Sequence, residues 1–274
     1  MSLFIVDRET CKRDGICVAE CPVRIIALDG DGFPVPQDGA DERCINCGHC
    51  VAVCPTASLT LKTMAPDDCQ PVRRDLRPSM EQVREWVLSR RSIREYKPRP
   101  VEKDLLAELI DVARYAPTGS NLQPVRWLVV ERPDRVHRLA GLVVDWMRDM
   151  VAGNKAPRDL LDRMARIIET FDSGYDYICR GAPHMVLAHG PADLPATLPA
   201  CIIALTTLEL LAPAYGLGAC WAGYFNSAAQ SHAPLIEALG MPDGHQTCGA
   251  LMIGYPKYAY HRIPLRNQAV IDWR

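Results

Sequence analysis

Four cysteines within a short run have the spacing that most clearly indicates chemistry in this sequence. Cys44, Cys47 and Cys50 are separated by two residues each, and Cys54 follows after three more and precedes a proline. Thiolates with this spacing bind [4Fe–4S] clusters, and the cysteine before the proline conventionally ligates the other cluster of a pair. Zinc sites typically use two C-x2-C pairs separated by a longer loop instead. The run therefore predicts a protein that carries electrons one at a time.

An altered copy of this run lies upstream and resembles the first half of a two-cluster ferredoxin. It has an aspartate, Asp14, where the second cysteine belongs. By that resemblance, the first cluster is held by Cys11, Cys17 and Cys54, with Asp14 as a candidate fourth ligand. The second is held by Cys21, Cys44, Cys47 and Cys50. Because a carboxylate is a harder ligand than a thiolate, the first cluster is Asp-ligated, water-ligated or a three-iron [3Fe–4S] form. An exposed loop carboxylate is an equally good interpretation of Asp14.

The composition is that of an ordinary soluble protein. The chain has 274 residues, 48% of them apolar and 23% charged, and a net charge of −2 gives no reason to expect nucleic acid as a partner. The apolar stretch 194–236 is interrupted by Pro199, Glu209 and Pro213, so a buried helix is expected there and not a membrane span. The apolar segment at the N-terminus is too short and has the wrong flanking residues for a signal peptide. Free thiols and labile clusters predict a cytoplasmic protein.

Three segments follow from the distribution of cysteine, proline and apolar residues. Residues 1–64 are predicted to form a small iron–sulfur domain whose clusters replace a hydrophobic core. Residues 65–78 contain three prolines and mixed charge, which is typical of a linker. Residues 79–274 are predicted to form a larger domain in which strands alternate with helices, so the fold class is α+β.

The hydrophobic periodicity predicts the elements of this larger domain. A helix begins after Ser79, with Gln82 completing a capping box, and a second begins at Glu102 and stops before Pro117. The further helices are predicted over 134–151, 157–171 and 200–215. The strands are predicted over 127–131, 185–189, 220–225 and 247–254.

A second candidate site lies where the first of these helices ends. Arg90, Arg91, Ser92 and Arg94 place three guanidinium groups and a hydroxyl within five residues. Guanidinium groups bind phosphate through a rigid pair of donors. A basic helix end is also common as a solvated terminus that complements the helix dipole, so the motif alone does not decide the ligand.

Three later segments add to it and together resemble the nitroreductase family of FMN enzymes. The motifs are R-R-S-x-R-x-[FY] at 90–96, A-P-[ST]-x-x-N-x-Q-P at 116–124, G-x-[CT]-W at 218–221, and a late G-Y-P at 254–256 followed by R-I-P-x-R at 262–266. They frame residues 79–274. With residues 1–64 added, the chain resembles the ferredoxin–nitroreductase fusions of bacteria and archaea.

The resemblance implies an intertwined homodimer with one FMN at each interface. It assigns FMN contacts to Arg90, Arg91, Ser92 and Arg94, to Ser120, Asn121 and Gln123, and to Trp221, Ala222 and Gly223, with Arg262 or Arg266 on the phosphate. Asn121 and Trp221 are the candidates nearest the reactive flavin N5. The sequence departs from the family at Val125, often Trp there, and at Tyr260, which is Lys in some members.

These expectations combine into an FMN-dependent oxidoreductase that receives electrons through its clusters. The substrate is expected to be a small electrophile such as a nitroaromatic, a quinone or an enone. An external ferredoxin or NAD(P)H is the expected donor. The alternative is a non-catalytic electron carrier or redox sensor. Apart from these motifs, His184 is more simply a structural imidazole than a catalytic group.

Overall fold

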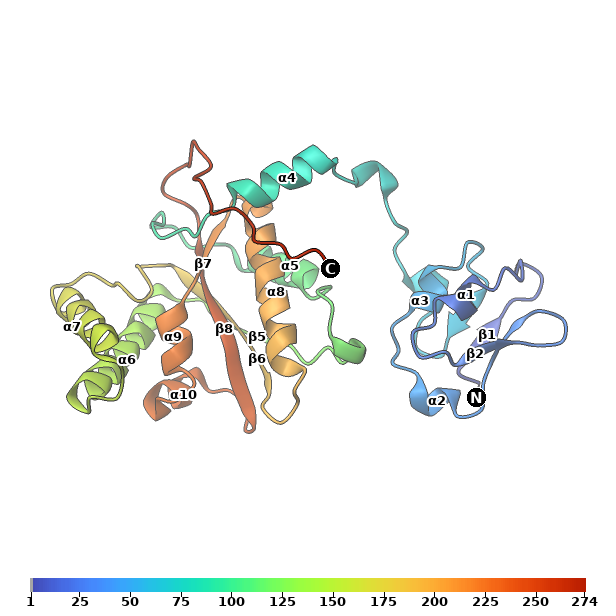
Figure 1. The fold of residues 1–274 in the computed structure, drawn as a ribbon, viewed down its shortest axis with the longest axis horizontal. Coiled ribbons are helices and arrows are strands. Elements are labelled where there is room, and N and C mark those ends of the chain that lie inside the picture. Colours follow the sequence, from blue (N-terminus) through green and yellow to red (C-terminus); the bar gives the residue numbers. More distant parts are fainter. Residues whose placement is uncertain (1) are drawn as a thin grey trace. The chain divides into compact units, whose positions relative to one another are not determined.

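The computed structural model describes residues 2–274, and its internal contacts divide the chain into two units. The first unit is Met1–Pro78 together with Gly119–Leu122, and the second is Ser79–Thr118 together with Gln123–Arg274. Figure 1 shows the elements of each unit.

The first unit is a duplicated arrangement of short strands and short helices. Two antiparallel pairs of strands form, β1 with β4 and β2 with β3. The strands are β1 (Phe4–Val6), β2 (Ile26–Leu28), β3 (Pro34–Pro36) and β4 (Leu59–Leu61), and the helices are α1 (Ile16–Ala19), α2 (Ala40–Arg43) and α3 (His49–Ala52). The short apolar segments that follow each Cys-Pro pair thus end in β2 and β4.

The backbone repeats between the two halves of this unit. Gly15 and Gly48 precede α1 and α3 with φ of 69° and 71°, left-handed values that glycine adopts without steric cost. Arg24 and Ala57 follow the two Cys-Pro pairs with φ of 51° and 53°. The duplication visible in the sequence is therefore also a duplication of conformation.

Cysteines form part of the small core of this unit. Cys17, Cys21 and Cys50 are buried together with apolar side chains such as Ile25 and Leu59. A domain this small buries too little surface to be stable through its core alone. The burial of three predicted ligands in the core fits stabilisation by bound metal.

The second unit is built on a four-stranded antiparallel sheet with the order β5-β6-β8-β7. The central strands β6 and β8 are long, and β5 and β7 form the two edges (Figure 1). The strands are β5 (Arg126–Val130), β6 (His184–Pro191), β7 (Gly218–Trp221) and β8 (His245–Gly254).

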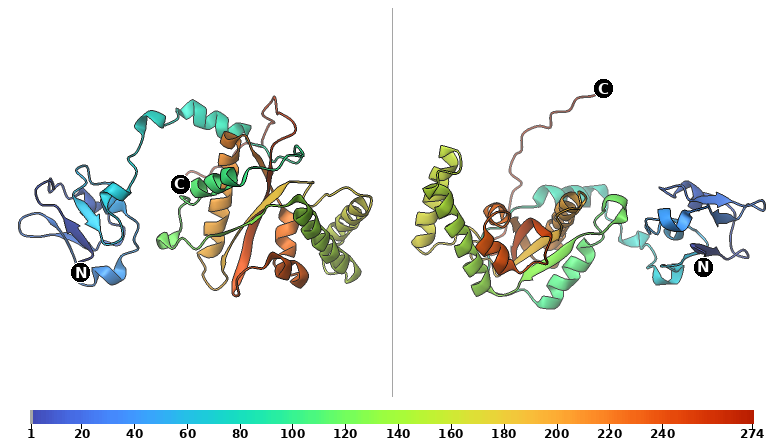
Figure 2. Two further views of the ribbon diagram at one scale, coloured as in Figure 1. Left: turned by 180° about the vertical axis from the view of Figure 1, so that it is seen from behind. Right: turned by 90° about the horizontal axis from the view of Figure 1, so that it is seen from below.

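Helices cover both faces of this sheet, as the two views in Figure 2 show. The helices α5 (Lys103–Ala113) and α8 (Thr197–Leu211) pack on one face. The other face is covered by α6 (Pro133–Ala152), α7 (Arg158–Asp172), α9 (Gly223–Ala228) and α10 (Ala233–Leu239). The remaining helix, α4 (Met80–Ser89), begins at the predicted Ser79–Gln82 capping box, in which Gln82 N donates to Ser79 Oγ at 3.2 Å.

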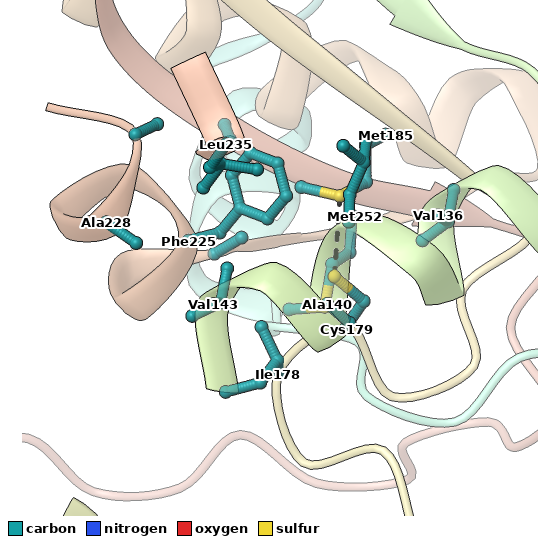
Figure 3. Close-up of a cluster of buried hydrophobic side chains, with 14 of the residues drawn as sticks. Val136, Ala140, Val143, Ile178, Cys179, Met185, Phe225, Ala228, Leu235 and Met252 are labelled. Carbon is teal, nitrogen blue, oxygen red and sulfur yellow. Dashed lines mark hydrogen bonds between the residues drawn. The ribbon is translucent and has the colours of Figure 1, made fainter. Parts of the chain in front are cut away.

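Side chains of β6 alternate between the two cores, as the period of a strand requires. Met185 and Leu187 enter the core beneath α6, whereas Val186 and Ala188 enter the core beneath α5 and α8. Figure 3 shows the first of these cores, where Phe225 packs among residues of α6 and the Cys179 thiol donates to Met185 Sδ at 3.5 Å. A strand buried on both faces explains its nearly continuous apolar sequence.

The apolar stretch around α8 is a helix of this sheet layer. Thr197–Tyr215 is long and apolar enough to cross a membrane by length and composition, and 44% of it is buried. Cys201, Leu205 and Leu208 pack against the sheet, while Leu198, Ile202 and Ile203 are exposed.

Two element predictions differ from the structure near the C-terminal part of the sheet. The strand predicted over 220–225 ends at Trp221, and α9 begins at Gly223 because helical spacing lets Phe225 and Ala228 share one buried side. The helix predicted over 200–215 ends at Leu211 and continues as a 3-10 turn through Pro213. The helix α10 had no counterpart among the predictions.

Candidate functional site

The cysteines of the two halves meet in the crossed pairs that the ferredoxin resemblance implies. Burial raises the pKa of Cys17, and the nearby groups of Cys54 and Asp14 raise it further. Burial raises the pKa of Cys50 to about 11, with Cys47 and Cys21 contributing. Cys54 of the second half is therefore a neighbour of the first set, and Cys21 of the first half is a neighbour of the second.

A cavity joins all four residues predicted to hold the second cluster. Its lining includes Cys21, Cys44, Cys47 and Cys50, with Gly48 at the turn between them. Gly48 has a left-handed φ of 71°, and a Cβ there would lie 2.8 Å from Met64 Sδ, so the backbone conformation and the close side chain both favour glycine. Among residues 2–274, no three His, Cys, Asp or Glu side chains are placed to hold a single metal ion. The four thiols around one cavity fit the predicted cluster.

Asp14 is exposed and already has a structural role. Its Oδ1 accepts a hydrogen bond from Ile16 N at 3.1 Å, at the start of α1. It lies near enough to Cys17 to raise the pKa of that thiol. Capping and cluster ligation use different oxygens, so the structure is compatible with either interpretation of this residue.

Arg90, the first residue of the arginine motif, forms an ion pair with Glu209, a carboxylate that belongs to none of the sequence motifs. Arg90 Nη1 donates to Glu209 Oε1 at 2.9 Å, and Trp221 Nε1 donates to Glu209 Oε2 at 3.1 Å. The Glu209 side chain is 8% exposed and that of Arg90 is 25% exposed. Glu209 thus connects two segments that the family resemblance assigns to FMN. The one feature of the sequence that could have pointed to Glu209 is that no other Asp, Glu, Lys or Arg occurs in the stretch 194–236.

The ring of Trp221 is fixed by close packing as well as by its hydrogen bond. A Cβ at Gly249 would lie 2.8 Å from Trp221 Cζ3 and 2.5 Å from Leu205 Cδ1. Gly249 has a φ of 153° beside an irregularity in the pairing of β6 with β8. The indole therefore lies against bare backbone, and only glycine leaves room for it.

A cavity of about 220 Å³ adjoins the carboxylate of Glu209. Arg90, Arg91, Glu209, Tyr258 and Tyr260 are among the residues that line it. Arg91 Nε is buried and has no acceptor among residues 2–274. An unpaired guanidinium donor beside a cavity is what a phosphate or a similar anionic group would satisfy, so these residues fit FMN.

Ser92 and Arg94 face a different neighbour, Cys220 of β7. Burial raises the pKa of Cys220, whereas the nearby guanidinium groups of Arg94 and Arg180 lower it. Arg180 was not predicted as a site residue. It has a φ of 55° within a turn whose amides at 178, 179 and 181 donate to Asp176, and its guanidinium lies 4.4 Å from the centre of the Tyr177 ring.

The loop 118–123 has an unusual backbone. Ser120, Asn121 and Gln123 have φ of 48°, 53° and 47°, and left-handed values at non-glycine residues are strained. Asn121 Nδ2 donates to the carbonyl oxygens of Ile45 and Asn46 within the first unit, at 3.2 and 2.9 Å. Gln123 belongs to the second unit, where it lines a cavity of about 540 Å³ beside α5 and β5.

The remaining predicted residues lie in three places. Ala222 is buried directly after β7, and Gly223 begins α9. Arg262 and Arg266 lie in an exposed tail, residues 257–274, which forms no helix or strand. His184 is buried and its Nε2 accepts a hydrogen bond from Val101 N at 2.7 Å, which is a structural role.

Comparison with known proteins follows this division of the chain. The 4Fe-4S dicluster domain matches residues 3–55, and the nitroreductase family matches residues 87–255. A curated relative, NADH dehydrogenase of Thermus thermophilus, is 30% identical over 69% of this chain and 94% of its own. Another, 5,6-dimethylbenzimidazole synthase of Rhodospirillum rubrum, is 27% identical over 69% of this chain and 86% of its own.

A solved structure shares the fold of the second unit. The nitroreductase of Bacteroides fragilis with bound FMN superposes with a TM-score of 0.58 at 18% identity, over 70% of this chain and 99% of its own. The mixed sheet-and-helix fold predicted for this region is confirmed. The chain belongs to the nitroreductase family and carries a 4Fe-4S dicluster domain ahead of its nitroreductase domain.

Proposed function

We propose that this protein is an FMN-dependent oxidoreductase that receives single electrons through two iron–sulfur clusters and reduces a small electrophile. The observation that carries the proposal is the pairing of two sites in one chain. One is the crossed arrangement of the cysteines, and the other is the cavity where Arg91 has an unpaired donor beside the Glu209–Arg90 pair.

Each group of site residues has a proposed role that follows from its chemistry. When bound, FMN would supply hydride transfer and the clusters would supply transfer of single electrons. Arg90 and Arg91 would bind the phosphate end, and Ser92, Arg94, Ser120, Asn121 and Gln123 would orient the cofactor. Trp221, Ala222 and Gly223 would form the wall beside the ring.

A homodimer is part of this proposal. Among residues 2–274, the outer edge of β5 has no neighbouring strand, α8 exposes Leu198, Ile202 and Ile203, and the tail 257–274 exposes further apolar side chains. Apolar surface of this kind marks interaction sites. Exchange of the tail between two copies would cover it and bring Arg262 or Arg266 to an FMN phosphate.

The proposed setting is a reducing cytoplasm. All twelve cysteines are free, and thiols remain reduced where glutathione and thioredoxin operate. NAD(P)H and an external ferredoxin are the proposed alternative donors, and a nitroaromatic, a quinone or an enone is the proposed acceptor.

Anaerobic purification with iron, sulfide and FMN counted per chain tests the cofactors. Two [4Fe–4S] clusters require about eight irons, and a three-iron first cluster requires about seven. One FMN per chain is expected. Protein that retains no iron and no flavin, and that takes up neither on anaerobic reconstitution, would contradict the proposal.

Turnover distinguishes an enzyme from a carrier. Reduced protein is mixed anaerobically with an excess of a nitroaromatic, a quinone or an enone, and product is measured against enzyme concentration. Many turnovers per chain are expected for at least one acceptor. Stopped-flow mixing with NADPH then shows whether the flavin is reduced without a ferredoxin. A single stoichiometric oxidation with every acceptor would favour an electron carrier.

A further inference from the structure

A chain of hydroxyl groups ends at Cys54, the ligand that the second half of the duplicated unit would contribute to the first cluster. Thr56 Oγ1 lies 3.7 Å from Cys54 Sγ, and Ser58 Oγ lies 2.6 Å from Thr56 Oγ1. Ser58 N also donates to Cys54 Sγ at 3.3 Å. Ser58 is only 4% exposed. The sulfur therefore faces a short chain of donors in a largely buried place.

The hydroxyl of Thr56 has a defined direction when Cys54 is a thiolate. A thiolate only accepts, so the proton of Thr56 points to the sulfur. Thr10 Oγ1 donates its proton to Asp7 Oδ2 at 2.7 Å and lies 2.9 Å from Ser58 Oγ. Ser58 therefore has two acceptors within reach for its one hydroxyl proton, the oxygens of Thr56 and Thr10.

The duplication provides an internal comparison. Cys21 and Cys54 are each followed by proline, and Arg24 and Ala57 then share the left-handed conformation, so the two segments correspond residue by residue in sequence. The positions of Thr56 and Ser58 are occupied by Val23 and Ile25 in the first half. Neither of these side chains has a hydroxyl to donate. The ligand Cys21 of the second cluster thus lacks the side-chain donors that Cys54 has.

We propose that Thr56 and Ser58 are positioning residues that raise the reduction potential of the first cluster selectively. The proposal rests on the two clusters of the proposed function. Hydrogen bonds to a ligating sulfur stabilise its negative charge, and a reduced cluster carries one more negative charge than an oxidised one. Donors at Cys54 therefore favour the reduced state of the cluster that Cys54 ligates. The cluster bound through Cys21 does not receive this stabilisation.

Redox titration of the anaerobic holoenzyme with dithionite, followed by electron paramagnetic resonance, tests the proposal. The variants are Thr56→Val, Ser58→Ala and the double variant, each nearly isosteric with the native residue. The signal that changes in Asp14→Cys is assigned to the first cluster. We expect its midpoint potential to fall in Thr56→Val and to fall further in the double variant, with the second signal unchanged.

Val23→Thr is the matched control, because it places a hydroxyl at the equivalent position near Cys21. It should leave the potential of the first cluster unchanged. An unchanged first potential in the double variant at native iron content would overturn the proposal, as would an equal shift of both signals. If the double variant loses iron, the midpoint potential of the first cluster in Thr56→Val alone tests the proposal. Native protein without clusters would instead overturn the proposed function, so the two failures are distinguishable.

Discussion

Glu209 places a negative charge near the C-terminal end of a helix, where the helix dipole disfavours it. It lies in the last turn of α8, beside the negative end of the helix dipole, and it is almost completely buried. A buried carboxylate is costly unless its oxygens are bonded and its charge is paired. Arg90 and Trp221 each take one oxygen. A leucine at this position would avoid the cost, so the carboxylate is best explained by the two segments that it holds together.

Replacement of Glu209 by Gln is expected to weaken FMN binding about tenfold, equivalent to about 1.4 kcal/mol, because Arg90 and Trp221 lose their shared anchor. Flavin fluorescence titration of apoprotein measures the dissociation constant. Asp172→Asn is the control, since it removes a carboxylate from the exposed pair with Arg148. Tighter binding in Glu209→Gln would show that Glu209 only neutralises Arg90 and competes with the phosphate.

In the proposed two-cluster protein, Asp14 would decide whether the first cluster holds three or four irons. Replacing it by Cys restores the complete four-cysteine spacing, and thiolate is the better ligand for iron in a cluster. We expect the iron content of Asp14→Cys to reach about eight per chain with two four-iron signals. A three-iron signal that persists in this variant would mean that the fourth iron is lost for a reason other than the aspartate.

At the scale of elements, β6 carries two buried histidines into the centre of the sheet. Burial lowers the pKa of His189, and the neighbouring His245 on β8 and Arg126 on β5 lower it further. The Nδ1 atoms of His189 and His245 lie 2.9 Å apart. Burial also lowers the pKa of His184, despite the opposing effect of Glu131. Both imidazoles are therefore kept neutral in the folded protein more strongly than in the unfolded chain.

The protein should consequently lose stability in mild acid. The unfolded histidines take up protons below about pH 6.5, which the folded histidines resist, so the free energy of unfolding falls as the pH drops towards the folded pKa values. Thermal unfolding followed by circular dichroism between about pH 5 and pH 8 measures this. His189→Gln should flatten the dependence. An equally steep dependence in that variant would assign the effect to other groups.

At the scale of the whole molecule, the C-terminal tail is the segment whose side chains are most exposed. Residues 257–274 contain Arg262 and Arg266, and side chains such as Leu265 and Trp273 are 99% and 88% exposed. Exposed apolar side chains are also a risk of unwanted association. In the proposed homodimer, burial against the second copy would cover these side chains and complete the environment of the two arginines.

Ending the chain at Pro256 should therefore convert the proposed dimer to a species with the mass of one truncated chain, below the 30.4 kDa of the 274-residue chain, and weaken flavin retention. Light scattering during size-exclusion chromatography measures the mass, and absorbance of the eluted flavin measures retention. Ending the chain at Val270 is the control, because both arginines remain. A dimer with full flavin content after the longer truncation would exclude exchange of the tail.

The sequence by itself determined what depends on residue type and local spacing. The cysteine runs identified the dicluster domain, and the four motifs between residues 90 and 266 identified the nitroreductase family, because both sites use short segments with fixed side-chain chemistry. Hydrophobic period and capping also located α4, α5, α6 and α7, since those signals lie within each helix. The short strand β7 was overextended into α9, where a run of aromatic residues fits either structure.

Only the tertiary structure decided the relations between distant residues. Glu209 meets Arg90 and Trp221 because α8 crosses the sheet beside the end of β7, and no local pattern specifies that approach. Arg180 faces Cys220 because a turn held by Asp176 directs it there. The contacts of Cys54 are local in sequence, but only the folded loop shows that the Thr56 hydroxyl and the Ser58 amide reach its sulfur. The contacts of Glu209 and Arg180 arise from packing across long sequence separations, which residue types and spacing do not encode on their own.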